Sequence, residues 1–293
     1  MLRIGVLCSG GLGLDTLIKL ADYCPIEFIL TDKKSAGIIS FAKQHKTPCF
    51  KGNPRDGRGH DFIKNLKVDV IASINYLFLI EKDIIDHPDI LAFNIHGSLL
   101  PKYRGRTPHV WAIINGETVA GITAHLINSG CDSGDIIYQI KVPIFKEDTG
   151  ADMLKKYSKE YFPLAKKILQ NIESNRLNFT PQNESEVTYF GKRTPDDGEI
   201  NWNWKKERIR NWVRAQSYPY PGAFTFLGDE KIIVDKVSHS DFDILESQIN
   251  GEVISVDPYV IVKVKDGALK LDEIRTENST FVVGNLLCNE NRT

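Results

Sequence analysis

The stretch that decides the fold is Leu2–Leu30, LRIGVLCSGGLGLDTLIKLADYCPIEFIL. An apolar run over Leu2–Cys8 predicts a first strand, and it leads directly into a glycine-rich turn, which is not typical of a signal peptide. Apolar residues at helical spacing over Leu14–Asp22 predict a helix, and Ile26–Leu30 predicts a second strand. A strand, a helix and a strand in this order indicate a parallel pair joined by a crossover.

The same alternation continues through the first half of the chain. Further strands are expected at Thr47–Phe50, Val68–Ser73, Leu91–His96, Val119–Leu126 and Ile136–Val142. Further helices are expected at Gly37–His45, His60–Leu66, Glu81–Asp86 and, as a long amphipathic helix, Ala151–Arg176. This rhythm predicts an α/β fold with an open, mostly parallel, Rossmann-like sheet and helices on both faces. In such sheets ligands bind at the carboxyl ends of the strands.

The pattern changes towards the C-terminus. A helix is expected at Lys205–Gln216, and after Pro219 and Pro221 come five short strand-like runs: Ala223–Leu227, Lys231–Val237, Gly251–Val256, Tyr259–Val264 and Ala268–Ile274. They predict a smaller C-terminal domain of β-barrel type. We therefore expect a catalytic domain over residues 1–185, a connecting segment with a helix over 186–222, and a small β domain over 223–293.

Composition narrows the class of protein. The 293 residues are 42% hydrophobic and 26% charged, which is ordinary for a globular protein, and no apolar run is long enough to span a membrane. Net charge is −1, so no polyanionic partner is indicated. Five scattered cysteines without CxxC spacing predict a reducing, cytoplasmic environment and no metal site: Cys8, Cys24, Cys49, Cys131 and Cys288.

Polar residues that could take part in catalysis lie where the predicted strand Leu91–His96 ends. Side chains alternate across a strand, so Asn94 and His96 project to the same side, at the carboxyl edge of the sheet. The loop Asn128–Asp135, between two predicted strands, carries two carboxylates, and Asp132 or Asp135 can reach His96 if it folds back. Spacing alone leaves open whether His96 is catalytic or a structural hydrogen-bonding residue.

Two segments resemble a known family. FNIHGSLLPKYRGRTP, from Phe93, followed by GITAHLINSGCDSGDIIYQ, from Gly121, is similar to the signature of formyltransferases that use N10-formyltetrahydrofolate. Weaker similarity extends over nearly the whole chain. The resemblance implies a formyl group transfer to an amine, with folate as co-substrate and no metal.

The resemblance also implies roles for individual residues. The family's catalytic residues fall on Asn94, His96 and Asp132. An amide can donate a hydrogen bond to the oxyanion, an imidazole can carry the proton, and a carboxylate can orient the imidazole. The implied folate pocket comprises Phe78, Leu79, Ile80, Arg106, Asn128, Ser129, Gly130, Cys131 and Asp132.

A glycine loop follows the first predicted strand. It begins with Ser9, Gly10 and Gly11, at a position where phosphates often bind. Asp32 lies about twenty residues further on, as in dinucleotide sites, but the glycines do not fit GxGxxG, so nicotinamide binding is not expected. We expect the loop to contact the acceptor substrate, with a plain tight turn as the alternative.

Three classes of amine could accept the formyl group: glycinamide ribonucleotide, initiator methionyl-tRNA and a nucleotide-linked amino sugar. Glycinamide ribonucleotide is disfavoured by chain length and by Gly97, where the corresponding enzyme tends to have proline. Initiator methionyl-tRNA is the alternative that fits a two-domain chain, but residues 191–293 hold 14 lysines and arginines against 17 aspartates and glutamates. An acidic region does not favour a polyanion such as tRNA, so no nucleic-acid partner is expected.

A nucleotide-linked amino sugar remains. FGKRTPDDGEINWNW, from Phe190, and SYPYPGAF, from Ser217, resemble the sugar N-formyltransferases, whose members act on dTDP-, UDP- and GDP-linked amino sugars. The resemblance favours dTDP-4-amino-4,6-dideoxyglucose as acceptor, in O-antigen or related glycan synthesis, and a homodimer. Residues expected to bind the sugar nucleotide, besides the glycine loop, are Lys102, Arg104, Tyr218 and Tyr220, with Lys192, Arg193 and Trp202 as further candidates.

Overall fold

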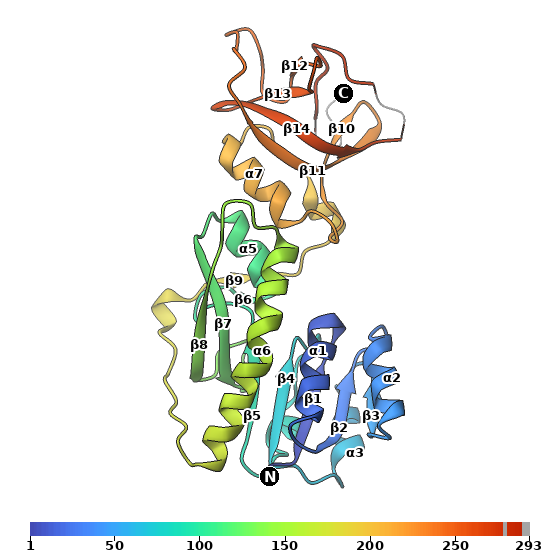
Figure 1. Ribbon diagram of the computed structural model, residues 1–293, viewed down its shortest axis with the longest axis vertical. Coiled ribbons are helices and arrows are strands. Elements are labelled where there is room, and N and C mark those ends of the chain that lie inside the picture. The colour runs from blue at the N-terminus through green and yellow to red at the C-terminus, as the bar shows by residue number, and fades with distance from the viewer. Residues whose placement is uncertain (278–279, 289–293) are drawn as a thin grey trace. The chain divides into compact units, whose positions relative to one another are not determined.

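A computed structural model describes residues 1–277 and 280–288 (Figure 1). The chain divides into two compact units. The first comprises residues 1–108, 120–142 and 154–191, and the second comprises 109–119, 143–153 and 192–293. Each unit has its own sheet, and they are described separately.

The first unit is built on a seven-stranded sheet in the order β3-β2-β1-β4-β5-β7-β8. Strands β1 to β5 all pair in parallel with one another, whereas β7 pairs with β5 in the antiparallel direction. The predicted open, mostly parallel sheet is thus confirmed. The strands span Ile4–Cys8 (β1), Ile26–Thr31 (β2), Cys49–Lys51 (β3), Val70–Ile74 (β4), Leu91–His96 (β5), Val119–Leu126 (β7) and Ile136–Pro143 (β8).

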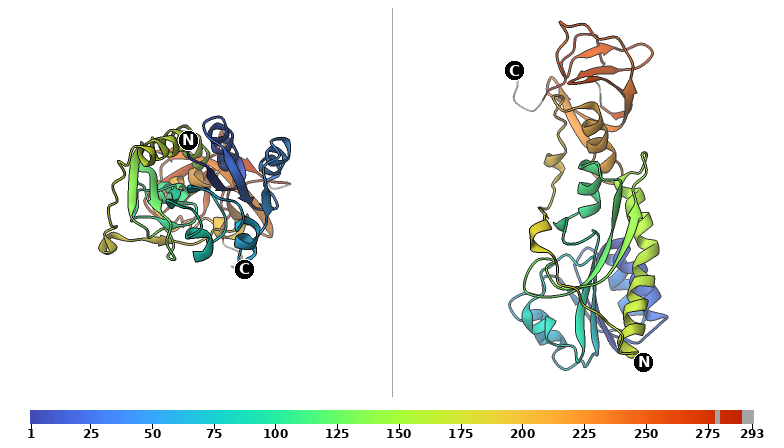
Figure 2. Two further views of the ribbon diagram at one scale, coloured as in Figure 1. Left: turned by 90° about the horizontal axis from the view of Figure 1, so that it is seen from below. Right: turned by 90° about the vertical axis from the view of Figure 1, so that its left-hand side faces the viewer.

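Helices cover both faces of this sheet, as Figures 1 and 2 show. Helices α1 (Gly10–Ala21), α2 (Ala36–Gln44) and α6 (Gly150–Glu173) lie on one face, and α3 (Arg58–Ile63) and α4 (Lys82–Ile85) on the other. Ile63 and Ile84 from the second pair pack in one buried cluster with Leu7 and Phe28 of the sheet. The apolar strands are therefore buried on both sides, as parallel strands require.

Two short strands and a helix were not expected from the sequence. Strand β6 (Arg104–Gly105) pairs in parallel with β9 (Tyr189–Phe190), and α5 spans Pro108–Ile114. Two-residue strands show no periodicity, so only the folded chain reveals them. Their pairing joins the loop after β5 to the segment after α6, which also holds the short 3₁₀ helix η1 (Glu184–Glu186).

The second unit contains α7 (Lys206–Ala215), the 3₁₀ helix η2 (Pro195–Gly198) and a five-stranded antiparallel sheet, in the order β10-β11-β14-β13-β12. Residues 285–288 bond the free edges of β10 and β12, at Phe226 and Val253, and so close the sheet, as predicted for a β-barrel type. The strands span Ala223–Leu227 (β10), Glu230–Ser240 (β11), Val253–Ser255 (β12), Ile261–Val264 (β13) and Gly267–Arg275 (β14).

Helix length and polarity bear on membrane association. In the part of the chain that the structure describes, no helix combines the length and the apolar character needed to cross a bilayer.

Candidate active site

Strand β5 carries the first two site residues. Because β5 is paired with β4 on one side and β7 on the other, its position in the sheet is fixed along its length. The antiparallel register places Asn94 opposite His125 and His96 opposite Thr123. Four polar side chains thus meet on two neighbouring strands that are otherwise apolar.

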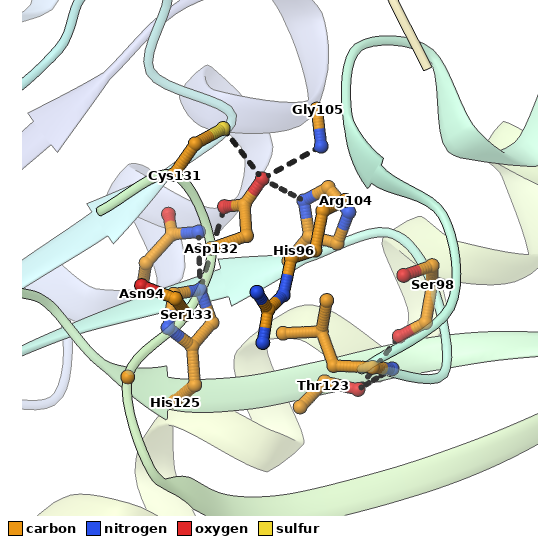
Figure 3. A network of polar contacts seen from close by, with 12 residues as sticks. Asn94, His96, Ser98, Arg104, Gly105, Thr123, His125, Cys131, Asp132 and Ser133 are labelled. Atoms are coloured by element: carbon orange, nitrogen blue, oxygen red, sulfur yellow. Dashed lines mark hydrogen bonds and ion pairs between the residues drawn. The ribbon is translucent and has the colours of Figure 1, made fainter. Parts of the chain in front are cut away.

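The loop between β7 and β8 brings Asp132 to these residues (Figure 3). One carboxylate oxygen, Oδ2, lies 3.6 Å from Nδ1 of His96, and the other lies 3.6 Å from Nε2 of His125. The amide N–H of Gly105 donates to Oδ2 at 2.9 Å. The structure therefore brings together Asn94, His96 and Asp132, the three residues predicted as catalytic.

The hydrogen bonds of His96 define which nitrogen carries its proton. Nε2 lies 2.8 Å from the backbone oxygen of Tyr103, which can only accept, so this nitrogen carries the hydrogen. In the neutral imidazole Nδ1 is then the free base, and it faces Asp132. Protonation at Nδ1 would give an imidazolium whose two N–H groups both point towards oxygen.

Burial and charge oppose each other in this pair. Burial lowers the pKa of His96 below its ordinary value of 6.5, and the attraction of Asp132 offsets part of this effect. Burial alone would raise the pKa of Asp132, but the positive charge that His96 carries when protonated and the hydrogen bond from the Gly105 N–H hold this pKa well below its ordinary value. At neutral pH the site thus holds a neutral imidazole beside an ionised carboxylate.

Asn94 is oriented by His125. Nδ1 of His125 lies 2.8 Å from the carbonyl oxygen of Leu126 and donates to it, which leaves Nε2 as an acceptor. The Asn94 amide donates to this nitrogen at 3.1 Å. One amide hydrogen of Asn94 is thereby fixed, and the direction of the other is set by the planar amide.

Thr123 and His125 were not among the predicted site residues. Thr123 Oγ1 donates to the carbonyl of Ser98 at 2.6 Å and accepts from Leu100 N at 3.1 Å, which holds the loop after β5 (Figure 3). In the sequence, Thr123 and His125 are two polar residues at alternate positions of an otherwise apolar strand, which predicts that they share one face of it. Only the pairing of β7 with β5 shows that this face is the one that carries Asn94 and His96.

Comparison with known proteins connects this geometry to a family. Residues 29–163 match the family described as formyl transferase, and residues 192–292 match the formyl transferase C-terminal domain. The chain belongs to the formyltransferase family. The resemblance found in the sequence is confirmed, and the protein is a formyltransferase.

Solved structures with the same fold include three with related descriptions. WlaRD, a sugar 3-N-formyltransferase solved with dTDP and 5-N-formyl-THF, is 23% identical, with a TM-score of 0.69 over 96% of this chain and 99% of that one. An N-formyltransferase from Helicobacter canadensis, in complex with folinic acid and dTDP-3-aminofucose, is 21% identical, with a TM-score of 0.69 over 92% and 99%. A 4-N-formyltransferase from Francisella tularensis is 23% identical, with a TM-score of 0.63 over 76% and 91%. At these identities the likeness establishes the fold.

The residues predicted to bind folate in this formyltransferase lie in three segments of the first unit, which follow β4, β6 and β7. Phe78, Leu79 and Ile80 follow β4, and the Arg106 guanidinium donates to the carbonyl of the preceding Leu77. Leu79 is 58% exposed, so this segment offers apolar surface. The other five residues, Asn128, Ser129, Gly130, Cys131 and Asp132, form the loop after β7, where Asn128 Oδ1 accepts from Gly130 N and Ser133 Oγ.

The predicted sugar-nucleotide residues of the first unit have different surroundings. Ser9 is buried, and Gly10 N at the start of α1 donates to Ser35 Oγ at 2.9 Å. Gly11 and Lys102 are exposed. Arg104, in contrast, is only 1% exposed and forms an ion pair with Glu184 at 2.7 Å.

The two predicted tyrosines belong to the second unit. Tyr218 is 80% exposed, whereas the Tyr220 hydroxyl lies 2.8 Å from Nε2 of His109. In residues 1–277 and 280–288, no group of three or more His, Cys, Asp or Glu side chains is placed to hold a metal ion. Which residues hold the nucleotide stays a prediction.

Proposed function

We propose that this formyltransferase moves the formyl group of N10-formyltetrahydrofolate to the amino group of a nucleotide-linked amino sugar. The observation that supports the transfer is the meeting of Asn94, His96 and Asp132 at the end of β5, with a neutral imidazole held beside a carboxylate. No other cluster described above combines an amide donor, a base and an orienting acid. The protein would work in the cytoplasm.

The side chains divide the chemistry among them. As the amine nitrogen bonds to the formyl carbon, the carbonyl oxygen gains negative charge, and the second N–H of Asn94 donates to it. A preorganised donor of this kind is worth about 3–4 kcal/mol. His96 Nδ1 takes the proton that the amine loses, and Asp132 stabilises the resulting imidazolium at 3.6 Å. The bond from the formyl carbon to N10 then breaks, and His96 returns the proton to N10.

The residues present fit a folate. A pterin needs an apolar wall and backbone hydrogen-bonding groups. The exposed Leu79 supplies apolar surface, and the exposed loop from Asn128 to Cys131 supplies backbone groups beside Asp132. WlaRD and the Helicobacter canadensis enzyme, by their descriptions, were solved with 5-N-formyl-THF and folinic acid, which supports the same co-substrate here.

The acceptor that we propose is dTDP-4-amino-4,6-dideoxyglucose. Two similar structures contain dTDP or a dTDP-linked amino sugar, and the acidic balance of residues 191–293 disfavours tRNA. The similar structures include both 3-N- and 4-N-formyltransferases, so the position of the amine must be measured. A product of this kind would serve O-antigen or related glycan synthesis.

The test is a panel of acceptors incubated with N10-formyltetrahydrofolate. It contains dTDP-4-amino-4,6-dideoxyglucose, its 3-amino isomers, UDP-4-amino-4-deoxy-arabinose, GDP-perosamine and initiator methionyl-tRNA. Tetrahydrofolate release and the mass of the product are measured, with the His96→Gln variant and an acceptor-free reaction as controls. We expect formylation of the 4-amino dTDP sugar. Formylation of methionyl-tRNA alone, or formate release without acceptor, would overturn the proposal.

A further inference from the structure

A ring of hydrogen bonds lies behind the loop that carries Asp132. Its centre is Gln182, which lies between α6 and η1 in a stretch without regular secondary structure. The Gln182 amide nitrogen donates to the backbone oxygens of Asp132, at 2.8 Å, and Gly134, at 2.7 Å. Its oxygen accepts from Arg104, from Nε at 3.1 Å and Nη2 at 2.8 Å. One side chain thus connects the Asp132 loop to the loop after β5.

Arg104 is itself fixed by hydrogen bonds and by burial. Its guanidinium donates to Glu184 at 2.7 Å and to the hydroxyl of Tyr189 at 2.9 Å, in addition to Gln182. At 1% exposure it is among the most completely buried large side chains of the protein. The rigid fork of a guanidinium fixes the positions of several acceptors at once, which the single ammonium of a lysine does not.

The backbone on either side of Arg104 touches the catalytic pair directly. The Tyr103 oxygen accepts from His96, and the Gly105 N–H donates to the Asp132 carboxylate at 2.9 Å. Pairing of β6 with β9 anchors this segment, with Arg104 N donating to the oxygen of Thr188. The ring therefore closes from the Asp132 carboxylate, through Gly105, Arg104 and Gln182, to the Asp132 backbone.

The conformation of the Asp132 loop needs stabilisation from outside the loop. Asp132 has a φ of +50°, a left-handed conformation that is unfavourable for a non-glycine residue by about 1–3 kcal/mol. The residues before it in the loop, from Asn128 to Cys131, are exposed. We therefore expect that loss of the external bonds would let the loop relax and move the carboxylate away from His96.

We propose that Arg104 and Gln182 are positioning residues, which hold Asp132 against His96 through hydrogen bonds to the loop that carries it. The proposal rests on the proposed formyl transfer. It gives Arg104 a role other than the nucleotide contact predicted from the sequence, because the guanidinium is buried and its donors are directed to Gln182, Glu184 and Tyr189.

The variant that tests this is Gln182→Leu, which keeps a similar size and removes both donated bonds. We expect kcat to fall about 10-fold to 100-fold, as for other small misplacements of catalytic groups, while the KM of the acceptor stays the same. The pKa of His96, followed by NMR of ¹³C-labelled histidine, should fall, because Asp132 no longer attracts the imidazolium. Asp132 and His125 are the titratable groups that face His96.

The NMR titration separates this proposal from the proposed function. In an Asp132→Asn background, Gln182→Leu should leave the pKa of His96 unchanged, because Gln182 acts through Asp132. Glu186→Gln, in η1, is the matched control and should resemble the wild type. If Gln182→Leu does not fold, as judged by circular dichroism, Arg104→Lys replaces it with the same expected results.

An unchanged kcat and an unchanged His96 pKa in a folded variant would overturn the positioning role. Absence of formyl transfer in the wild-type protein would instead overturn the proposed function, and the titration would still decide on the positioning role.

Discussion

His96 carries the proton in the proposed transfer, so its replacement should have the largest effect of any single change. His96→Gln keeps a polar side chain of similar length but cannot act as a base. We expect the rate constant of formyl transfer, measured in single-turnover experiments, to fall about 10²-fold to 10⁴-fold, which is the usual contribution of general acid–base catalysis. His45→Gln, an exposed histidine of the same unit that stacks on Phe41, is the control. Unchanged turnover in His96→Gln would remove His96 from the mechanism.

The pH dependence of the reaction follows from the opposing effects on His96. The base must be neutral, and burial lowers the pKa of His96 below 6.5, so kcat/KM should rise with pH through a midpoint below that value. Asp132 raises the pKa of His96, whereas a charged His125 lowers it. Asp132→Asn should therefore move the midpoint to lower pH as well as reduce the rate. A midpoint that moves to higher pH would contradict this account of the pair.

At the scale of elements, the turn between β7 and β8 depends on a glycine. A Cβ on Gly134 would lie 1.9 Å from the backbone oxygen of Leu126, so Gly134→Ala must displace the turn next to Asp132. We expect a loss of stability of about 1–3 kcal/mol, measured by denaturant unfolding, together with a lower kcat. Gly191→Ala is the matched control, because a Cβ there meets no atom within 4 Å. Wild-type kcat in Gly134→Ala would show that the turn does not position Asp132.

The start of α1 allows a test of the predicted acceptor contact. Gly11 lies in the first turn, where an added Cβ meets no atom within 4 Å. Gly11→Ala should stabilise the protein by about 0.5–1 kcal/mol, because alanine costs less entropy than glycine in a helix. If the loop contacts the acceptor, the new methyl group should also raise the KM of the sugar nucleotide. A higher melting temperature with an unchanged KM would argue for a plain turn.

Strands β5 and β7 show how much of the site could be predicted from the sequence. The bounds of β5 and β7 were predicted as observed, because apolar runs with polar loops at their ends define strands locally. Their pairing was not predictable, and with it the contact of Asn94 with His125. Gln182 lies in a polar stretch with no periodicity, and its partner Arg104 is 78 residues away in the chain. Such long-range hydrogen bonds leave no local pattern.

At the scale of the whole molecule, the second unit depends on the last described residues of the chain. Phe226 and Cys288 exchange two backbone hydrogen bonds of 3.1 Å, which join residues 285–288 to β10. On the other side, Val253 N donates to Asn285 O at 2.8 Å, and Leu287 N donates to Gly251 O at 2.8 Å. Leu287 is 2% exposed, so this segment also fills the core of the unit.

Deletion of residues 285–293 should therefore open the barrel. Four backbone bonds contribute about 0.5–1.5 kcal/mol each, and burial of Leu287 contributes about 1.5–3 kcal/mol. The total is several kcal/mol, which approaches the roughly 5–15 kcal/mol that stabilises a whole domain. We expect an unfolding transition at lower temperature and faster proteolysis within residues 192–284. Deletion of residues 289–293 alone removes none of these four bonds and should leave the transition in place, whereas equal melting of the longer deletion and the wild type would show that the closing segment contributes little.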